Sequence, residues 1–212
     1  IENGPILIIM HKNFFITGYP GSGKTTIFNS IVTDLKENIP DLHLYGFITR
    51  EIREEGRRIG FSIENYEGKK GILSHIYYKD GPKVGKYRVN LRDFENVGMN
   101  TLHHALRDPD IKIIAIDEIG KMELFHPDFL KILDRITDSD KIVLATVSYK
   151  MKELLAKFGN RSDALIFNLE NAPKDTSERK NLKEKILKSI LKKISTLHPK
   201  TSPSVPYLNP SC

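Results

Sequence analysis

The sequence contains a single cysteine, Cys212, and neither tryptophan nor glutamine. One cysteine excludes a disulfide framework and a cysteine-based metal site within one chain, and it fits a reducing, cytoplasmic compartment. No run of about 18 apolar residues is present, so we expect no membrane-spanning segment and no membrane partner. The shortage of thermolabile amides beside abundant Lys and Glu is a thermophile trait, although Asn remains common and codon bias gives the same composition.

The chain carries a net charge of +6, which fits either a solvated, lysine-rich surface or attraction to polyanions such as nucleotide phosphates and nucleic acids. Its 212 residues suffice for one domain with a sizeable core, which we expect over residues 10–195. Residues 1–9 precede Met10, which could be the native start, and are expected to be an N-terminal extension or a remnant of cloning. Residues 196–212 are rich in proline and predict an irregular C-terminal tail.

Strand and helix patterns alternate at both ends of the chain. Continuous apolar runs at 12–17, 111–117, 141–148 and 164–169 predict buried strands, and stripes of apolar residues with helical spacing predict helices between them and near the C-terminus. Between about residues 42 and 90, short segments rich in β-branched and aromatic residues are separated by glycines, which predicts an antiparallel insert beside the main sheet. The sequence therefore predicts a three-layer α/β fold with a mostly parallel central sheet.

Residues 18–25, GYPGSGKT, match the P-loop pattern in full, between a predicted strand and a predicted helix. Glycines let the backbone curl so that successive N–H groups face phosphate oxygens, and the following helix adds the positive end of its dipole. Lys24 is expected to bridge the β- and γ-phosphates and to act in catalysis, and the Thr25 hydroxyl is expected to bind Mg²⁺. The predicted nucleotide-binding residues of this loop are Gly18, Tyr19, Pro20, Gly21, Ser22, Gly23, Lys24, Thr25 and Thr26.

A pair of acidic residues lies at the end of the apolar run 111–117. Asp117 closes this run, at the position where a P-loop needs a second carboxylate to hold the metal. Glu118 follows and could polarise a water molecule for attack on the γ-phosphorus, or could simply be a charged strand end. Gly120 completes the predicted nucleotide site. Lys121 could stabilise charge in the transition state as a catalytic residue, or could be a solvated lysine.

Three other signals are weaker. Thr146, inside an apolar strand pattern, could contact the γ-phosphate or the water molecule, or could be a hydrogen-bonded core threonine. Residues 160–163, NRSD, resemble the guanine-reading motif of GTPases, but Arg161 replaces the usual Lys and the motif precedes a strand, so guanine specificity is not supported. His103 and His104 point in diverging directions on a predicted helix and do not suit one metal ion.

Four blocks, GYPGSGKTT, GFITREIREEGRRIGFSI, KYRVNLRDFE and IIAIDEIGKMELF, occur in this order along the chain. They resemble the nucleoside-triphosphatase family of thermostable archaeal and bacterial enzymes, to which the human cancer-related nucleoside triphosphatase also belongs. The resemblance covers residues 12–169, and the stretch DEIGKMEL at 117–124 is much more specific than the P-loop. It implies a RecA-like P-loop fold and slow, magnesium-dependent hydrolysis of ATP, GTP and other nucleoside triphosphates, with loose base specificity.

The resemblance also implies roles for individual residues. Residues 18–25 would bind the phosphates, Asp117 the metal, and Glu118 would activate water. Several insert residues match the family pattern and some are expected to face the nucleotide, with Arg53 or Arg58 either at the γ-phosphate or solvated; the matching residues are Thr49, Glu51, Arg53, Arg58 and Phe61. The Asn-Arg pair usual after the last strand is absent, because Ala172 follows Asn171, so base recognition is in doubt.

Two other functions use the same features. A kinase for a nucleotide or small metabolite would need an acceptor pocket and an arginine-rich lid, which residues 51–58 could form. A nucleic-acid-associated nucleotide switch would use the basic final helix, but the sequence lacks interleaved aromatic and basic residues of the base-stacking type. Nucleoside triphosphates are therefore the expected partners, nucleic acid is not, and the sequence does not indicate an oligomeric state.

Overall fold

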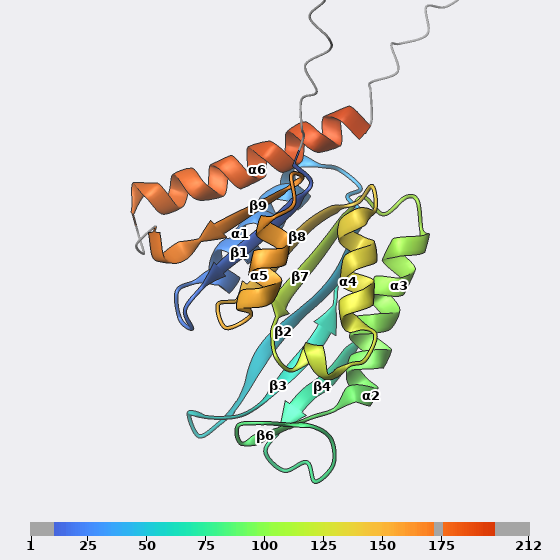
Figure 1. Ribbon diagram of the computed structural model, residues 1–212, viewed down its shortest axis with the longest axis vertical. Helices are drawn as coiled ribbons and strands as arrows, with labels where there is room; N and C mark the ends of the chain where they lie inside the picture. Colours follow the sequence, from blue (N-terminus) through green and yellow to red (C-terminus); the bar gives the residue numbers. More distant parts are fainter. Residues whose placement is uncertain (1–10, 172–175, 198–212) are drawn as a thin grey trace, which may run out of the picture.

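Figure 1 shows the computed structural model, which describes residues 11–171 and 176–197. The predicted N-terminal extension, residues 1–9, lies outside these ranges, as does nearly all of the predicted tail, residues 196–212. Within the described ranges, no helix is both long enough and apolar enough to cross a membrane.

A nine-stranded sheet runs through the described part of the chain in the order β5-β6-β4-β3-β2-β7-β8-β1-β9. The pairings β2–β7, β7–β8, β8–β1 and β1–β9 are parallel, and the other four are antiparallel. The sheet is therefore mixed: the strands from β2 to β9 in this order pair in parallel, as predicted for the main sheet, and the strands from β2 to β5 pair antiparallel, so the sheet as a whole is not mostly parallel. The strands are β1 (Asn13–Gly18), β2 (Leu44–Glu54), β3 (Arg57–Asn65), β4 (Lys70–His75), β5 (Lys83–Val84), β6 (Tyr87–Val89), β7 (Ile113–Ile119), β8 (Ile142–Ser148) and β9 (Ala164–Asn168).

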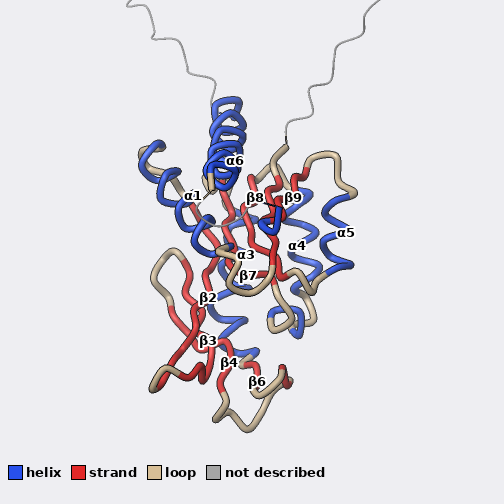
Figure 2. Tube along the Cα trace, turned by 90° about the vertical axis from the view of Figure 1, so that its left-hand side faces the viewer, coloured by secondary structure: helices blue, strands red, loops and turns tan. Residues whose placement is uncertain are grey.

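Helices cover both faces of this sheet, which confirms the predicted three-layer α/β architecture. Figure 2 shows α1 on one side of the strands and α4 and α5 on the other. The helical segment over residues 91–107 contains a π-helical part, η1, and the last helix ends at Leu197. The helical elements are α1 (Lys24–Asn38), α2 (Leu91–Asp93), η1 (Phe94–Met99), α3 (Asn100–Arg107), η2 (Glu123–Phe125), α4 (Phe129–Asp138), α5 (Lys152–Gly159), η3 (Leu169–Asn171) and α6 (Ser177–Leu197).

Side chains of the central strands alternate between two buried cores, because successive residues of a strand point to opposite faces. Phe14 and Ile16 of β1 pack in the core that α1 and α6 cover. Phe15, between them, packs in the core under α3, α4 and α5. A strand buried on both faces has no polar side, which explains why the parallel strands read as continuous apolar runs.

The β-rich segment extends the main sheet instead of forming an insert beside it. β2 is a parallel member of the sheet, and β3, β4, β6 and β5 add to it in turn. Pairing of β2 with β7 ends where Ile48 faces Asp117, but β2 continues to Glu54. Residues 49–54 therefore project beyond the last β2–β7 pair, by about 20 Å at about 3.3 Å per residue. The β2–β3 hairpin thus forms a wall beside the strand ends that carry the predicted site.

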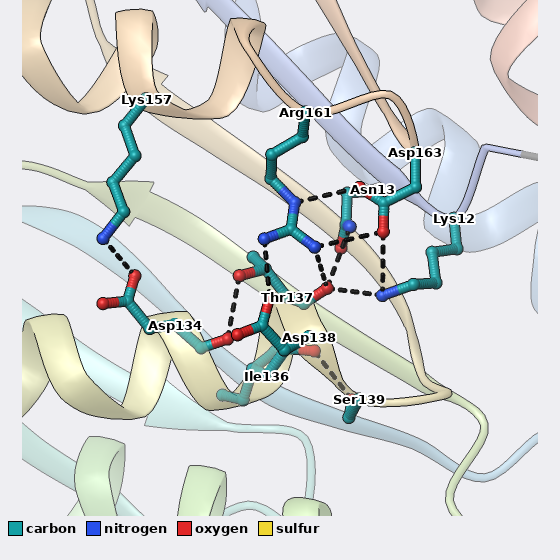
Figure 3. Close-up of polar contacts among 10 residues, drawn as sticks. All are labelled: Lys12, Asn13, Asp134, Ile136, Thr137, Asp138, Ser139, Lys157, Arg161 and Asp163. Atoms are coloured by element: carbon teal, nitrogen blue, oxygen red, sulfur yellow. Dashed lines mark hydrogen bonds and ion pairs between the residues drawn. The ribbon is translucent and has the colours of Figure 1, made fainter.

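A charged cluster joins α4, β1 and β9 at the end of the sheet opposite the P-loop (Figure 3). Arg161 donates hydrogen bonds to Asp163, to Asp138 and to the carbonyl oxygen of Thr137, and Lys12 lies 3.2 Å from Asp163. Burial alone would raise the pKa of Asp163, but hydrogen bonds from Arg161 and Lys12 outweigh it and bring the pKa to about 2. The NRSD motif therefore has a structural role far from the phosphate loop, in line with its rejection as a guanine reader.

Replacing Arg161 by alanine is expected to lower the free energy of unfolding by about 1–3 kcal/mol, because the partly buried Asp163 and the carbonyl oxygen of the buried Thr137 lose a charged donor. The control is Lys157→Ala, which removes an exposed ion pair with Asp134 in the same figure and should cost about 0–1 kcal/mol. Urea denaturation of both variants measures the difference. Equal losses would contradict the structural role given to Arg161.

Candidate nucleotide-binding site

The loop between β1 and α1 depends on glycines at positions that other residues rarely occupy. Gly21 and Gly23 have φ angles of +75° and +91°, and a Cβ atom on Gly18 would lie 2.7 Å from the Ser22 Oγ. Gly23, which has no side chain, is the N-cap of α1, and the helix starts at Lys24. The first N–H groups of the helix are therefore not capped by that residue and can bind an anion.

Lys24 connects this loop to the end of β7. Its Nζ donates to the carbonyl oxygens of Gly18 at 3.0 Å and Tyr19 at 3.4 Å, and lies 3.8 Å from Glu118 Oε2. The Lys24 residue is only 7% exposed. A buried ammonium group held in this position is available to a phosphate that enters the loop.

Asp117 lies behind the loop and is 1% exposed. Its Oδ1 accepts a hydrogen bond from Thr146 Oγ1 at 2.5 Å, and it is also hydrogen-bonded to Thr25. Burial raises the pKa of Asp117, and these hydrogen bonds and the charge of Lys24 oppose the rise. Thr146 is thus a hydrogen-bonded core residue beneath the carboxylate. Thr146 belongs to β8, which lies between β1 and β7. The strand that carries Asp117 is therefore not the direct neighbour of the strand that leads into the P-loop.

Glu118 faces the cavity, and its side chain is 34% exposed. Burial is the largest effect on the pKa of Glu118 and raises it, and the charge of Asp117 adds to the rise. The charge of Lys24 and a hydrogen bond with Ser148 lower the pKa but do not cancel the rise. The peptide bond between Asp117 and Glu118 is cis. A carboxylate beside a lysine, with a raised pKa, is suited to accept a proton near neutral pH.

A third acidic group, Glu123, was not predicted as part of the site. It is 4% exposed, and its Oε2 accepts a hydrogen bond from the Gly120 N–H at 3.0 Å. Burial, chiefly, raises the pKa of Glu123 to about 8. This side chain therefore fixes the turn that carries the predicted residues Gly120 and Lys121, and Lys121 itself is exposed at the cavity.

A cavity of about 1180 Å³ brings the loop, the end of β7, the β-rich segment and α6 together. Asp117 is buried beneath it, Tyr19 is 53% exposed and packs edge-on against Tyr149, and Gly18 and Ser22 do not line it. Predicted residues that do line it are Pro20, Gly21, Gly23, Lys24, Thr25, Thr26, Glu118, Gly120 and Lys121. From the β-rich segment, Thr49, Glu51, Arg58 and Phe61 line it, whereas Arg53 does not.

Sequence reasoning missed the contribution of α6 to this cavity. Four residues at the start of that helix and just before it line the cavity: Thr176, Arg179, Lys180 and Lys183. Arg179 reaches the P-loop, donating to the carbonyl oxygen of Ser22 at 2.5 Å. The basic side of the final helix was the available signal. Ala172, which stands where the family usually has the arginine of an Asn-Arg pair, lies outside the described residues.

A glycine loop at a helix N-terminus, a buried lysine and adjoining carboxylates in one cavity define a P-loop nucleotide-binding protein. Residues 13–200 match the NTPase family, and the chain belongs to that family. It is 41% identical over 177 residues to the nucleoside-triphosphatase THEP1 of Thermotoga sp. (strain RQ2), covering 84% of this chain and 94% of that protein. It is 34% identical over 171 residues to the human cancer-related nucleoside-triphosphatase, covering 76% and 89%.

Two solved structures are also similar. The crystal structure of THEP1 from the hyperthermophile Aquifex aeolicus has a TM-score of 0.67 and 33% identity, covering 84% of this chain and 98% of that one. The solution structure of the human cancer-related nucleoside triphosphatase has a TM-score of 0.67 and 32% identity, covering 85% and 98%. The family resemblance seen in the sequence is therefore confirmed, and with it the class of enzyme.

Glu123→Gln is expected to flatten the fall of stability with pH. The folded pKa of Glu123, about 8, is raised from the ordinary value of 4.5, so the folded state keeps a proton that the unfolded state has lost. Stability from this group is therefore lost as pH rises from about 4.5 to about 8. Urea denaturation across that range measures the slope.

The matched control is Glu37→Gln, at an exposed position of α1, which should keep the wild-type slope. If Glu123→Gln also keeps that slope, Glu123 does not hold a proton in the folded protein.

Proposed function

We propose that this chain hydrolyses nucleoside triphosphates to nucleoside diphosphates and phosphate, with Mg²⁺ and with loose base specificity. The observation that carries the proposal is the meeting of Lys24 and Glu118, 3.8 Å apart, at the phosphate loop. The names of the relatives support the same reaction. We also propose that the fold is RecA-like, because β8 lies between β1 and β7.

In this reaction Lys24 and the first N–H groups of α1 bind the β- and γ-phosphates. Glu118 accepts a proton from a water molecule as the water oxygen attacks the γ-phosphorus. The bond from the γ-phosphorus to the bridging oxygen breaks, and the nucleoside diphosphate leaves with that oxygen's electron pair. Lys24 stabilises the charge that develops there, and Lys121, which also lines the cavity, is a second cation that could do so.

The residues behind the loop fit a magnesium ion. Mg²⁺ prefers oxygen ligands and is usually held by one or two carboxylates together with substrate phosphates. Asp117 and the Thr25 hydroxyl supply such oxygens, and a cation would favour the ionised form of a carboxylate that burial disfavours. When bound, the ion neutralises charge on the phosphate oxygens.

Loose base specificity is supported by the chemistry of the α6 end of the cavity. The side chains that line it there are largely cations, Arg179, Lys180 and Lys183. Cations bind phosphate and ribose oxygens, which all nucleoside triphosphates share, and do not by themselves distinguish one base from another. This end is therefore expected to accept several bases.

Glu118→Gln is expected to lower the turnover number by about 100-fold or more, because the proton acceptor is lost. The isosteric change should leave the dissociation constant for ATP within about twofold, since Glu118 is not a phosphate ligand. Phosphate release and equilibrium binding measure the two quantities, with Glu37→Gln as the exposed control. Turnover that survives at the wild-type rate would show that Glu118 is not the base.

Asp117→Asn is expected to raise the Mg²⁺ concentration needed for half-maximal turnover by about tenfold or more, because a charged ligand becomes neutral. Removal of Mg²⁺ by a chelator should abolish turnover in the wild-type protein, and added Mg²⁺ should restore it. A titration of phosphate release against Mg²⁺ gives both results. An unchanged magnesium requirement in the variant would exclude Asp117 as a ligand.

A further inference from the structure

The cavity is larger than one ligand needs. Its volume of about 1180 Å³ exceeds the roughly 300–1,000 Å³ of ordinary small-molecule pockets. One end is formed by the P-loop and α6, and the other by β2, β3, β4 and the β5–β6 hairpin. We call the second the insert end; it is lined by Thr49, Glu51, Arg58, Phe61, Leu73, Val84, Gly85 and Tyr87.

The order of strands separates the two ends. β8, β7 and β2 lie between β1, which leads into the P-loop, and β3. At about 4.8 Å per strand, β1 and β3 are about 19 Å apart. Figures 1 and 2 both show the β2–β3 hairpin well away from α6. Glu118, at the end of β7, therefore stands between the two ends of the cavity.

A nucleotide in the proposed reaction fills only the first end. Its γ-phosphate must face Glu118, so the nucleoside leads away from Glu118 toward α6, where Arg179 and Lys180 line the cavity. This step rests on the proposed function. The insert end is then left beyond the γ-phosphate, still open to a second molecule.

Arg58 is held in place at the insert end. Its Nε donates to the Tyr87 hydroxyl at 3.0 Å, and its Nη1 donates to Glu51 at 2.6 Å. Its guanidinium lies 5.0 Å from the centre of the Phe61 ring, which in turn packs edge-on against Tyr87. Among the described residues, no hydrogen-bond partner is found for Arg58 Nη2. A fixed guanidinium with a remaining donor is suited to bind an anion.

Among the described residues that line the insert end, the one carboxylate, Glu51, is shared between two cations. Glu51 pairs with Arg53, which lies outside the cavity lining, at 2.5 Å as well as with Arg58, so its charge does not neutralise Arg58 alone. Burial would raise the pKa of Glu51, but hydrogen bonds from Arg58 and Arg53 outweigh it and lower the pKa. Lys121 also lines the cavity, from the turn that follows β7. A negatively charged group on a ligand would therefore complement Arg58 and Lys121.

Apolar side chains complete the insert end. Phe61, Leu73 and Val84 line it, and Leu73 is 1% exposed. An aromatic ring beside a cation favours a flat ligand group that can pack on both. We propose that the insert end binds a second small molecule, an anion with a flat apolar ring, whose carboxylate or phosphate is held by Arg58 while its ring packs on Phe61.

The test uses the full chain saturated with a non-hydrolysable ATP analogue and Mg²⁺, so that the P-loop is occupied. Phenyl phosphate and benzoate are the probes, with methyl phosphate lacking the ring and benzyl alcohol lacking the charge. Amide chemical shifts report binding. Phenyl phosphate or benzoate is expected to shift the signals of Phe61 and Val84, more strongly than either incomplete probe. The stronger of the two then distinguishes phosphate from carboxylate.

Arg58→Gln is expected to weaken binding of the better probe about tenfold, because a charged hydrogen bond is lost. Arg57→Gln is the matched control, since Arg57 is an exposed neighbour on β3 that does not line the cavity. Phe61→Leu keeps an apolar side chain but removes the ring, and should also weaken binding if Arg58→Gln does not fold. Equal affinity in wild type and all three variants, or no shifts at the insert end, would overturn the proposal.

ATP turnover is followed in the same samples without the analogue. If the wild-type protein binds the probe but does not hydrolyse ATP, the proposed hydrolysis is contradicted and the proposed second site is supported. If the wild-type protein hydrolyses ATP normally but does not bind the probe, only the proposed second site is contradicted.

Discussion

The crowding of acidic groups at the end of β7 is the constraint to which the rest of the site responds. Asp117 and Glu118 lie beside one buried ammonium group, that of Lys24, and Glu123 is close enough to both carboxylates for their charges to raise its pKa. Uncompensated carboxylates cost free energy in such surroundings. Each one is compensated differently: Asp117 by hydroxyl hydrogen bonds, Glu118 by partial exposure beside Lys24, and Glu123 by keeping its proton. The proposed Mg²⁺ belongs to the same balance, because a triphosphate adds further negative charge to this region.

Much of the fold could be predicted from periodicity, because strands buried on both faces and helices with one apolar side leave clear patterns. The placement of residues 42–90 could not. Hairpin strands show the same alternation whether they stand beside a sheet or extend it, and only the pairing of β2 with β7 decides between the two. The π-helical segment η1 was also missed, since one extra residue in a turn leaves the apolar residues Met99 and Leu102 buried.

Part of the candidate site could also be predicted from the sequence, and part could not. The P-loop and the pair Asp117–Glu118 are local patterns, and their meeting follows from the rule that parallel strands end at one edge. Glu123 could not be recognised from sequence, because an acidic residue in a short helical turn is usually solvated. Arg179 needed knowledge of how α6 crosses the phosphate loop. Tyr87 supports Arg58 from a strand that only the tertiary fold brings near.

The last helix has a double attachment with a thermodynamic consequence. Ile186 and Ile190 of α6 pack in the core shared with α1, while Arg179 holds the loop from which α1 starts. A nucleotide bound against both helices would bind the folded chain and not the unfolded one, so mass action alone would raise the melting temperature with ligand concentration. The substrate of such a protein is also one of the agents that keep it folded.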